Sequence, residues 1–240
     1  MSHTPGAVKA VIFDLDDTLY DCSGTLVRSQ RLMAAKVIAR AIGCPEKEAY
    51  ELQLELDRKK TPDSDLYEAI ARQYSLPHSF LEDVKEALSE VSISGSGIKP
   101  FPGAVETLTE LKDRGFVLFL VTMGKREEQE EKVHVLGLDG LFGEIAILDT
   151  SKASPDAKKA SFKDILDRHG LKPEQVLCVG DRMDRELKVA KELGITTIMI
   201  KHGRHYQRFI SDPTNSEKPD IYIENMADLP GIVPVKQPSQ

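Results

Sequence analysis

The sequence predicts an α/β protein built on a doubly wound parallel sheet, with a helical segment inserted after the first strand. Short apolar runs alternate with stretches whose apolar residues recur at helical spacing, which is typical of a parallel sheet covered by helices on both faces. Between about residues 22 and 98 this alternation stops and only helical patterns remain. The two observations together predict a sheet-based core and a helical insertion.

Five apolar runs are expected to form buried strands, because they are nearly continuous in apolar residues. They occupy residues 8–13, 116–122, 144–149, 175–181 and 196–201, and a weaker run follows at 220–224. Two of the connecting segments carry leucines at helical spacing and stop at Gly115 and Gly194, as crossover helices often do.

The inserted segment shows four helical stretches, separated by breaks at 43–45, 61–63 and 76–77 that each contain a proline. A Ser- and Gly-rich return over residues 92–103 has the composition of a hinge or linker. We therefore predict an α/β core of residues 1–21 and 99–240 and a helical cap of residues 22–98. An ordinary helical subdomain packed on the sheet is the alternative.

Composition narrows the class of partner. Thirty-nine acidic against 32 basic residues give a net charge of -7, which argues against nucleic acid or an anionic membrane as the main partner and favours a small ligand. The three cysteines lack the spacing of a zinc site or a disulfide framework. No apolar run reaches membrane-spanning length, and the first ten residues do not resemble a signal peptide. We expect a cytoplasmic monomer or homodimer.

Four carboxylates follow the first predicted strand, at Asp14, Asp16, Asp17 and Asp21. Each raises the cost of ionising the others, so a positive or reactive group is expected among them. Ligands of open α/β sheets bind at the carboxyl ends of the strands, where Asp181 would also lie. Oxygen ligands of this kind suit Mg²⁺, which would offset the repulsion between Asp14 and Asp181.

A hydroxyl and an ammonium group are expected at the same edge. Thr122 ends the second strand, and a lysine-bearing segment at 154–162 opens the helix before the fourth strand. Together with Mg²⁺ they would form a receptor for a phosphoryl group, and a central carboxylate could attack phosphorus to give an aspartyl phosphate. A second carboxylate two residues on could serve as acid and base.

These segments resemble a known family. "DLDDT" after a buried strand, "LVTMGK" at the end of the next, and a lysine before "LKPEQVLCVGDRMD" are similar to the four motifs of the haloacid dehalogenase (HAD) superfamily, in their usual order. The resemblance extends from about Val8 to Leu229. It implies a Rossmann-like core and a phosphatase whose helical cap follows the first strand.

The resemblance also implies roles at the metal. Asp14 would be the nucleophile and a ligand of Mg²⁺. Asp16 would act as general acid and base and give its backbone carbonyl to the metal, and Asp181 would be the third protein ligand. Thr18 would steady the loop between them, and Asp184 would lie just outside the ligands.

At the phosphoryl group, the resemblance implies hydrogen bonds from Thr122 and from the backbone amides of Met123 and Gly124. Lys158 would neutralise the phosphoryl charge. Lys152, Lys159 and Lys163 compete with Lys158 for this role, which we assign by spacing to Phe162. Glu186 stands where many relatives have an aspartate, so the division of labour between Asp184 and Glu186 is open.

The leading hypothesis is a Mg²⁺-dependent phosphatase that hydrolyses a small phosphorylated metabolite. A phosphomutase of the same architecture would use the same residues but return the phosphoryl group to its substrate. A non-enzymatic phospho-aspartate signalling module is a weaker alternative, because such modules are about half as long and lack a helical insertion. The basic segment 201–208 is expected to be a solvated loop or subunit contact, with binding of an anionic substrate group as the alternative.

Overall fold

The computed structural model of the chain describes residues 8–59, 66–150, 154, 156–214 and 216–233. Contacts within the chain divide it into two compact units, one formed by Met1–Cys22 and Ile98–Gln240 and the other by Ser23–Gly97. Each unit has a hydrophobic core of its own.

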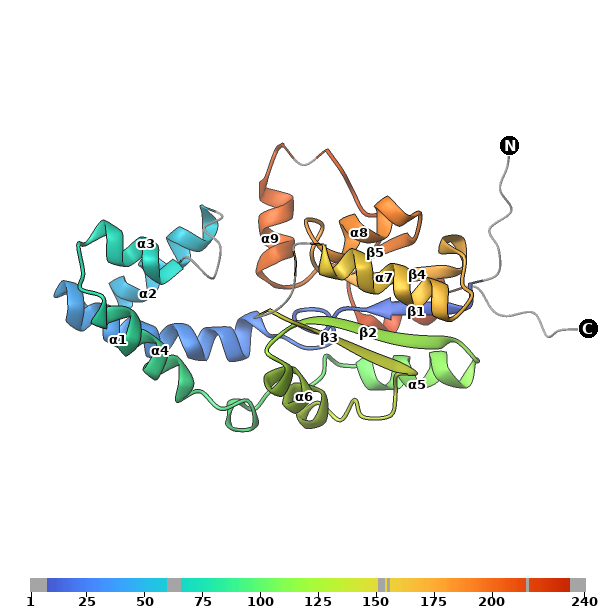
Figure 1. Ribbon diagram of the computed structural model, residues 1–240, viewed down its shortest axis with the longest axis horizontal. Helices are drawn as coiled ribbons and strands as arrows, with labels where there is room; N and C mark the ends of the chain where they lie inside the picture. Colours follow the sequence, from blue (N-terminus) through green and yellow to red (C-terminus); the bar gives the residue numbers. More distant parts are fainter. Residues whose placement is uncertain (1–7, 60–65, 151–153, 155, 215, 234–240) are drawn as a thin grey trace, which may run out of the picture. The chain divides into compact units, whose positions relative to one another are not determined.

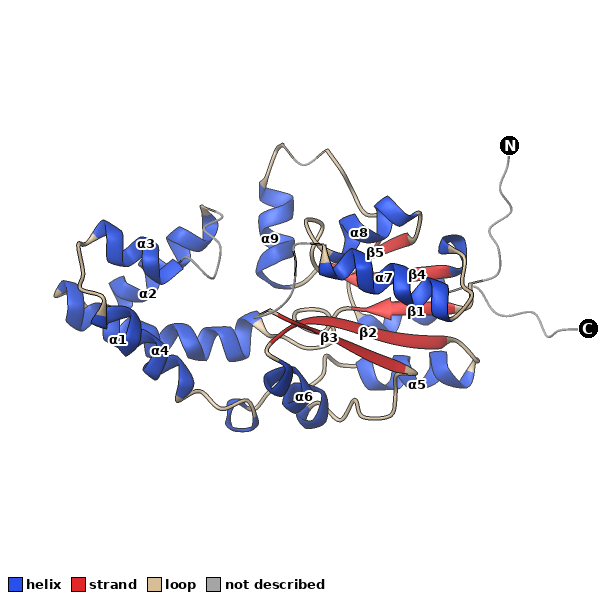
Figure 2. Cartoon of the chain, viewed as in Figure 1, coloured by secondary structure: helices blue, strands red, loops and turns tan. Residues whose placement is uncertain are grey.

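The described part of the first unit contains a six-stranded sheet in the order β3-β2-β1-β4-β5-β6, and all neighbouring strands are parallel (Figures 1 and 2). The strands are β1 (Ala10–Phe13), β2 (Val117–Gly124), β3 (Glu144–Asp149), β4 (Val176–Gly180), β5 (Thr196–Ile200) and β6 (Ile221–Ile223). The six predicted strands are therefore present, most of them shorter than expected by one or two residues. The predicted α/β fold is confirmed.

Helices cover both faces of this sheet, with α5 and α6 on one face and α7 and α8 on the other (Figure 1). The helices of this unit are α5 (Ala104–Asp113), α6 (Arg126–Val135), α7 (Ala157–Arg168), α8 (Glu186–Leu193), α9 (Gly203–Ser211) and α10 (Leu229–Ile232), with short 3₁₀ turns at Pro173–Gln175 and Met226–Asp228. Phe162 of α7, Leu187 of α8 and Ile12 of β1 belong to one buried cluster. Coverage on both faces explains why the strands are apolar throughout.

Glycine ends the crossover helix α8 as its sequence predicts. Gly194 has φ 82°, a left-handed conformation that side-chain-bearing residues rarely adopt. The amide of the next residue, Ile195, then donates to the carbonyl of Ala190 at 2.9 Å. This turn leads the chain directly into β5.

The described residues of the second unit form helices joined by turns and loops, without a strand. The unit contains a π-helical turn at Ser23–Val27, then α1 (Arg28–Ile42), α2 (Glu46–Arg58), α3 (Leu66–Gln73), α4 (Ser79–Ser89) and a 3₁₀ turn at Ser94–Ser96. Its core is formed by alanines and aliphatic residues of α1 against Phe80 and Val84 of α4. Inside it, Arg31 of α1 pairs with Asp57 of α2 at 3.1 Å, with both side chains buried.

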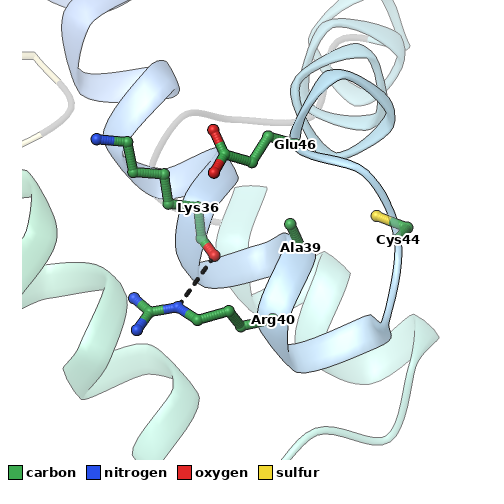
Figure 3. Close-up of a pocket in the computed structure, with 5 residues that line it drawn as sticks. All are labelled: Lys36, Ala39, Arg40, Cys44 and Glu46. Carbon is green, nitrogen blue, oxygen red and sulfur yellow. Dashed lines mark hydrogen bonds between the residues drawn. The ribbon is translucent and has the colours of Figure 1, made fainter.

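A surface pocket of the second unit lies between the end of α1 and the start of α2 (Figure 3). It is lined by Lys36, Ala39, Arg40, Cys44 and Glu46, and Arg40 donates from Nε to the carbonyl of Lys36 at 3.3 Å. None of the site residues expected from the sequence belongs to it. Over the part of the chain that the structure describes, no helix has the length and apolar character to cross a membrane.

Candidate active site

The carboxyl ends of the central strands bring the predicted acidic residues together. Asp14 directly follows β1, and its amide donates to the carbonyl of Val179 in β4 at 3.0 Å. Asp181 directly follows β4, next to β1 in the sheet. Thr122 lies near the end of β2, on the other side of β1. Strand order and register therefore place all three side chains at one edge.

Lys158 joins Asp14 to Glu186. Its Nζ lies 2.6 Å from Oδ1 of Asp14 and 2.9 Å from Oε2 of Glu186, and all three residues are buried. The lysine comes from the first turn of α7, and the glutamate is the first residue of α8. Burial alone would lower the pKa of Lys158, but the two carboxylates raise it above its usual range, so the ammonium form is favoured.

Asp14 is less easily ionised than an ordinary aspartate. Burial, opposed by Lys158 and reinforced by Glu186, raises its pKa to about 7. A cation that bound beside it would lower this pKa.

Glu186 has both carboxylate oxygens occupied. Oε2 accepts from Lys158, and Oε1 accepts from the backbone amide of Arg182 at 2.7 Å. A Cβ atom at Gly180 would lie 2.6 Å from Cγ of Glu186, so this close approach requires glycine at that position. Glu186 is thus built into the site as the partner of Lys158.

Asp184 lies outside this cluster. Its side chain is 70% exposed and pairs with the guanidinium group of Arg182, Nη2 to Oδ2, at 2.8 Å. Of the two acidic residues that the sequence left undecided, only Glu186 contacts the buried site.

The two carboxylate oxygens of Asp181 are among the buried polar atoms of the site that lack a hydrogen-bond partner in the described part of the chain. The residue is 1% exposed. Burial, with the neighbouring charges of Glu186 and Asp14, raises its pKa well above the ordinary range. An oxygen of Asp181 lies within 4.8 Å of oxygens of Asp14 and Glu186.

These donors fit a hard divalent cation. They are carboxylates only, which is the ligand type that Mg²⁺ prefers, and buried unpaired carboxylates need a positive partner. Both oxygens of Glu186 are engaged, by Lys158 and by the amide of Arg182, whereas neither oxygen of Asp181 has a hydrogen-bond partner among the described residues.

Asp16 is held by three side chains. Nζ of Lys132 lies 2.9 Å from its Oδ1 and 3.1 Å from its Oδ2, and the Tyr20 hydroxyl donates to Oδ1 at 2.5 Å. Nε2 of Gln129 lies 3.3 Å from Oδ2. Burial would raise the pKa of Asp16, but Lys132 and Tyr20 outweigh burial and lower it, so the carboxylate form is favoured.

The predicted phosphate-binding residues occupy the end of β2. Oγ1 of Thr122 and the carbonyl of Met123 each accept from Nε2 of Gln129, both at 2.9 Å. Gly124 lies so close to Gln129 that a Cβ atom there would come within 2.7 Å of Nε2. Gln129 therefore packs directly against the carboxyl end of β2.

Thr18 is fully buried in the turn that follows Asp16, where its amide donates to the carbonyl of Leu15 at 3.3 Å. Its hydroxyl has no hydrogen-bond partner among the described residues. The contact that holds this turn is thus made by the backbone.

The lysines that compete for the phosphate-binding role differ in burial and in their partners. Lys158 is buried at the site, whereas Lys159 forms an ion pair with Glu192 at 2.6 Å on the surface of α7 and α8. Lys163 is exposed. Lys152 lies outside the described residues.

Gln129, Lys132 and Tyr20 were not expected from the sequence. The α6 segment, REEQEEKVHV, has the composition of a solvated helix, and a lysine in it resembles any surface lysine. One signal was present: Gln129 lies three residues before Lys132 and four before Val133, so both are neighbours of Gln129 on one side of the helix. That face is the buried one.

Side chains of the basic segment 201–208 contact other residues of the first unit. Lys201 pairs with Glu224 at 2.6 Å, and His202 lies 3.3 Å from Asp21 with its ring against Phe101. Nε2 of His205 lies 3.4 Å from Nη1 of Arg182. Much of the expected loop is in fact helical, because α9 begins at Gly203.

Fold and site together define a hydrolase of the HAD class. The chain belongs to the haloacid dehalogenase-like hydrolase family, whose match covers residues 8–194. It is 29% identical over 231 residues to a glyceraldehyde 3-phosphate phosphatase of Methanocaldococcus jannaschii, covering 94% of this chain and 97% of that protein. It is 30% identical over 133 residues to a phosphoglycolate phosphatase of Mannheimia succiniciproducens, covering 55% and 57% of the two chains.

The solved structures agree in fold. A HAD phosphatase from Thermococcus onnurineus superposes with a TM-score of 0.62 at 22% identity, covering 95% of this chain and 99% of that one. The predicted family is confirmed, as is the prediction of an enzyme of the phosphoric monoester hydrolase class.

Proposed function

We propose that this chain is a Mg²⁺-dependent phosphatase that hydrolyses a small phosphorylated metabolite through an aspartyl phosphate on Asp14. The observation that carries the proposal is the arrangement around Asp14. Its buried carboxylate contacts the ammonium group of Lys158 and lies beside the carboxylate of Asp181, whose oxygens have no hydrogen-bond partner in the described ranges. A carboxylate nucleophile is repelled by a phosphoryl dianion, and the ammonium group of Lys158, with a cation held by Asp181, would offset this repulsion.

In the first step, an oxygen of Asp14 attacks phosphorus while the bond from phosphorus to the substrate oxygen breaks. Lys158 neutralises charge on Asp14 and on the transferring group. In its protonated form, Asp16 gives a proton to the departing oxygen. Without substrate the carboxylate form of Asp16 is favoured, and the negative charge of an incoming phosphoryl group would raise its pKa toward the acid form. In the second step, Asp16 takes a proton from the water that attacks the aspartyl phosphate, which releases inorganic phosphate and restores Asp14.

Asp14 and Asp181, with the backbone carbonyl of Asp16, would hold the Mg²⁺. The bound ion would polarise the phosphoryl oxygens and offset the negative charge that gathers there. Thr122 and the amides of Met123 and Gly124 would hold the phosphoryl oxygens at the end of β2. Glu186 would fix Lys158 in place.

We propose a short-chain sugar phosphate or phosphoglycolate as substrate. The support is similarity: relatives named for glyceraldehyde 3-phosphate match over nearly the whole chain, and others are named for phosphoglycolate. We also propose that the helical unit, close to the expected residues 22–98, acts as a cap that selects the substrate.

Phosphate release from the purified full chain tests the proposal. Glyceraldehyde 3-phosphate, phosphoglycolate and p-nitrophenyl phosphate would be assayed with Mg²⁺ and with EDTA. We expect sustained release with at least one metabolite, its loss with EDTA and its return with Mg²⁺. Metal-independent turnover would contradict the proposal, and isomerised sugar phosphate without phosphate release would favour the phosphomutase.

A further inference from the structure

Helix α6 turns a polar face toward the site. Among its ten residues, Gln129, Lys132 and Val133 are buried, and they share one side of the helix. The remaining acidic and basic residues of α6 are exposed, with the exception of the intermediate Glu128. A lysine on the inward face of a helix is unusual, because burying an ammonium group is costly unless it is paired.

The partner of Lys132 is Asp16. The ammonium group contacts both carboxylate oxygens, at 2.9 Å and 3.1 Å, and so spans the carboxylate. The side chain of Lys132 is 8% exposed, whereas that of Asp16 is 31% exposed. The Asp16 carboxylate is therefore bound by a buried ammonium group and still remains accessible to solvent. A buried or half-buried ion pair contributes little net stability compared with an apolar replacement. Stability alone therefore does not explain the lysine.

Gln129 connects the Asp16 carboxylate to the end of β2, where the expected phosphate-binding residues lie. Its Nε2 lies within 3.3 Å of Asp16 and 2.9 Å of Oγ1 of Thr122. Gly124 leaves the space that the amide occupies. One face of α6 thus connects the two sides of the site, with the lysine on Asp16 and the glutamine between Asp16 and Thr122.

We propose that Lys132 is a positioning residue for the phosphatase reaction: it fixes the Asp16 carboxylate in the orientation needed for proton transfer, relative to the end of β2. The inference rests on the proposed function. It assigns a role to a helix that none of the expected motifs includes. The charge of Lys132 also lowers the pKa of Asp16 and so disfavours its acid form. Because the ammonium group contacts both oxygens of Asp16, we expect the loss of orientation to outweigh this effect, so that loss of Lys132 impairs proton transfer by Asp16 more than it impairs attack by Asp14.

The leaving group separates these two effects. In the first step, the alkoxide of phosphoglycolate needs the proton that Asp16 gives as the phosphorus–oxygen bond breaks, whereas nitrophenolate departs readily without it. A misplaced Asp16 should therefore slow release of glycolate more than release of nitrophenol. The ratio of the two rates comes from one protein sample, so a smaller active fraction or a lower stability does not change it.

The test uses rapid-quench single turnovers of the full-length wild type and of Lys132→Met, Lys132→Arg and Lys159→Met. For Lys132→Met we expect glycolate release to fall on the order of 10-fold or more and nitrophenol release to fall by less than about threefold. Lys132→Arg should recover part of the loss, because it restores charged donors to Asp16. Lys159→Met, which removes an exposed ion pair with Glu192, should match the wild type.

An equal loss for both leaving groups, or a wild-type ratio in Lys132→Met, would overturn the inference while leaving the proposed function in place. Faster glycolate release in Lys132→Met would also overturn it. Failure of the wild type to release phosphate from any of the phosphate esters in the presence of Mg²⁺ would overturn the proposed function, and the inference with it. If Lys132→Met does not fold, Lys132→Gln takes its place: an unchanged leaving-group ratio in that variant would count against the role, and a raised ratio in favour of it.

Discussion

The ammonium group of Lys158 lies 2.6 Å from Oδ1 of Asp14, and both residues are buried. Asp14 comes from the end of the central strand β1 and Lys158 from the first turn of α7, so the contact joins segments 144 residues apart in the sequence. Glu186 holds the other side of the ammonium group. The pair thus places a fixed positive charge against the carboxylate that we propose as nucleophile.

Replacing Lys158 by alanine should lower kcat/KM by an amount equivalent to about 3 kcal/mol of transition-state stabilisation, because it removes the cation that neutralises the transferring charge. Steady-state kinetics with p-nitrophenyl phosphate measure this. Lys159→Ala is the matched control, since Lys159 is the next residue of α7 and pairs with Glu192 at the surface. A larger loss in the control than in Lys158→Ala would move the role to Lys159.

Asp181→Ala should raise the Mg²⁺ concentration needed for half-maximal activity steeply, because it removes the buried carboxylate whose oxygens have no partner among the described residues. Activity measured across a Mg²⁺ titration, after treatment with a chelator, gives this value. Asp184→Ala is the comparison, because Asp184 is exposed and pairs with Arg182. An unchanged Mg²⁺ requirement in Asp181→Ala would contradict the assigned metal ligand.

Asp16→Asn should slow the first step more for a sugar phosphate than for p-nitrophenyl phosphate, because it removes the proton donor to a poor leaving group. Single-turnover release of alcohol or nitrophenol is the appropriate measurement, since the second step is common to both substrates and can mask the difference. Equal losses would assign Asp16 to holding the metal through its backbone, and the general acid would then lie elsewhere.

The central strands and their end residues could be predicted from the sequence because each depends on local pattern. Val11, Ile12 and Phe13 are apolar in succession, and a parallel strand buried on both faces needs that. Asp14 and Asp181 follow such runs directly, and Asp16 lies two residues after Asp14, so strand order brings the three to one edge.

Other contacts could not be predicted, because they depend on which face of a helix turns inward. Lys132 and Lys159 look alike in sequence, yet one contacts Asp16 and the other Glu192 at the surface. Asp184 and Glu186 are likewise alike in sequence, because both are acidic and both follow β4 within six residues. Glu186 turns inward because Gly180 leaves room for it.

Asp220 gives the stability a predictable pH dependence. Its Oδ2 accepts from the amide and hydroxyl of Thr197 in β5, at 2.8 Å and 2.6 Å, and its Oδ1 pairs with Lys191 of α8 at 2.8 Å. Burial would raise its pKa, but these contacts outweigh burial and lower it. A lowered folded-state pKa means that the stabilisation is present above the unfolded-state pKa and is lost as pH falls through the folded-state pKa.

Asp220→Ala should therefore reduce the free energy of unfolding by about 1–2 kcal/mol at neutral pH, through loss of these hydrogen bonds. The difference from wild type should shrink once the pH falls below about 3.9, the ordinary value for aspartate. Urea unfolding at a series of pH values measures both quantities. A difference that stays constant into acid would contradict the assigned ionisation.

The central claim is that Asp14 carries the phosphoryl group during turnover. The most direct test is to quench the enzyme during hydrolysis, reduce it with borohydride and map the modified residue by mass spectrometry, because borohydride converts an aspartyl phosphate to homoserine. We predict homoserine at position 14 in the wild type, and none in an Asp14→Asn variant that is folded but inactive. Homoserine at another aspartate, or full activity in Asp14→Asn, would contradict the mechanism.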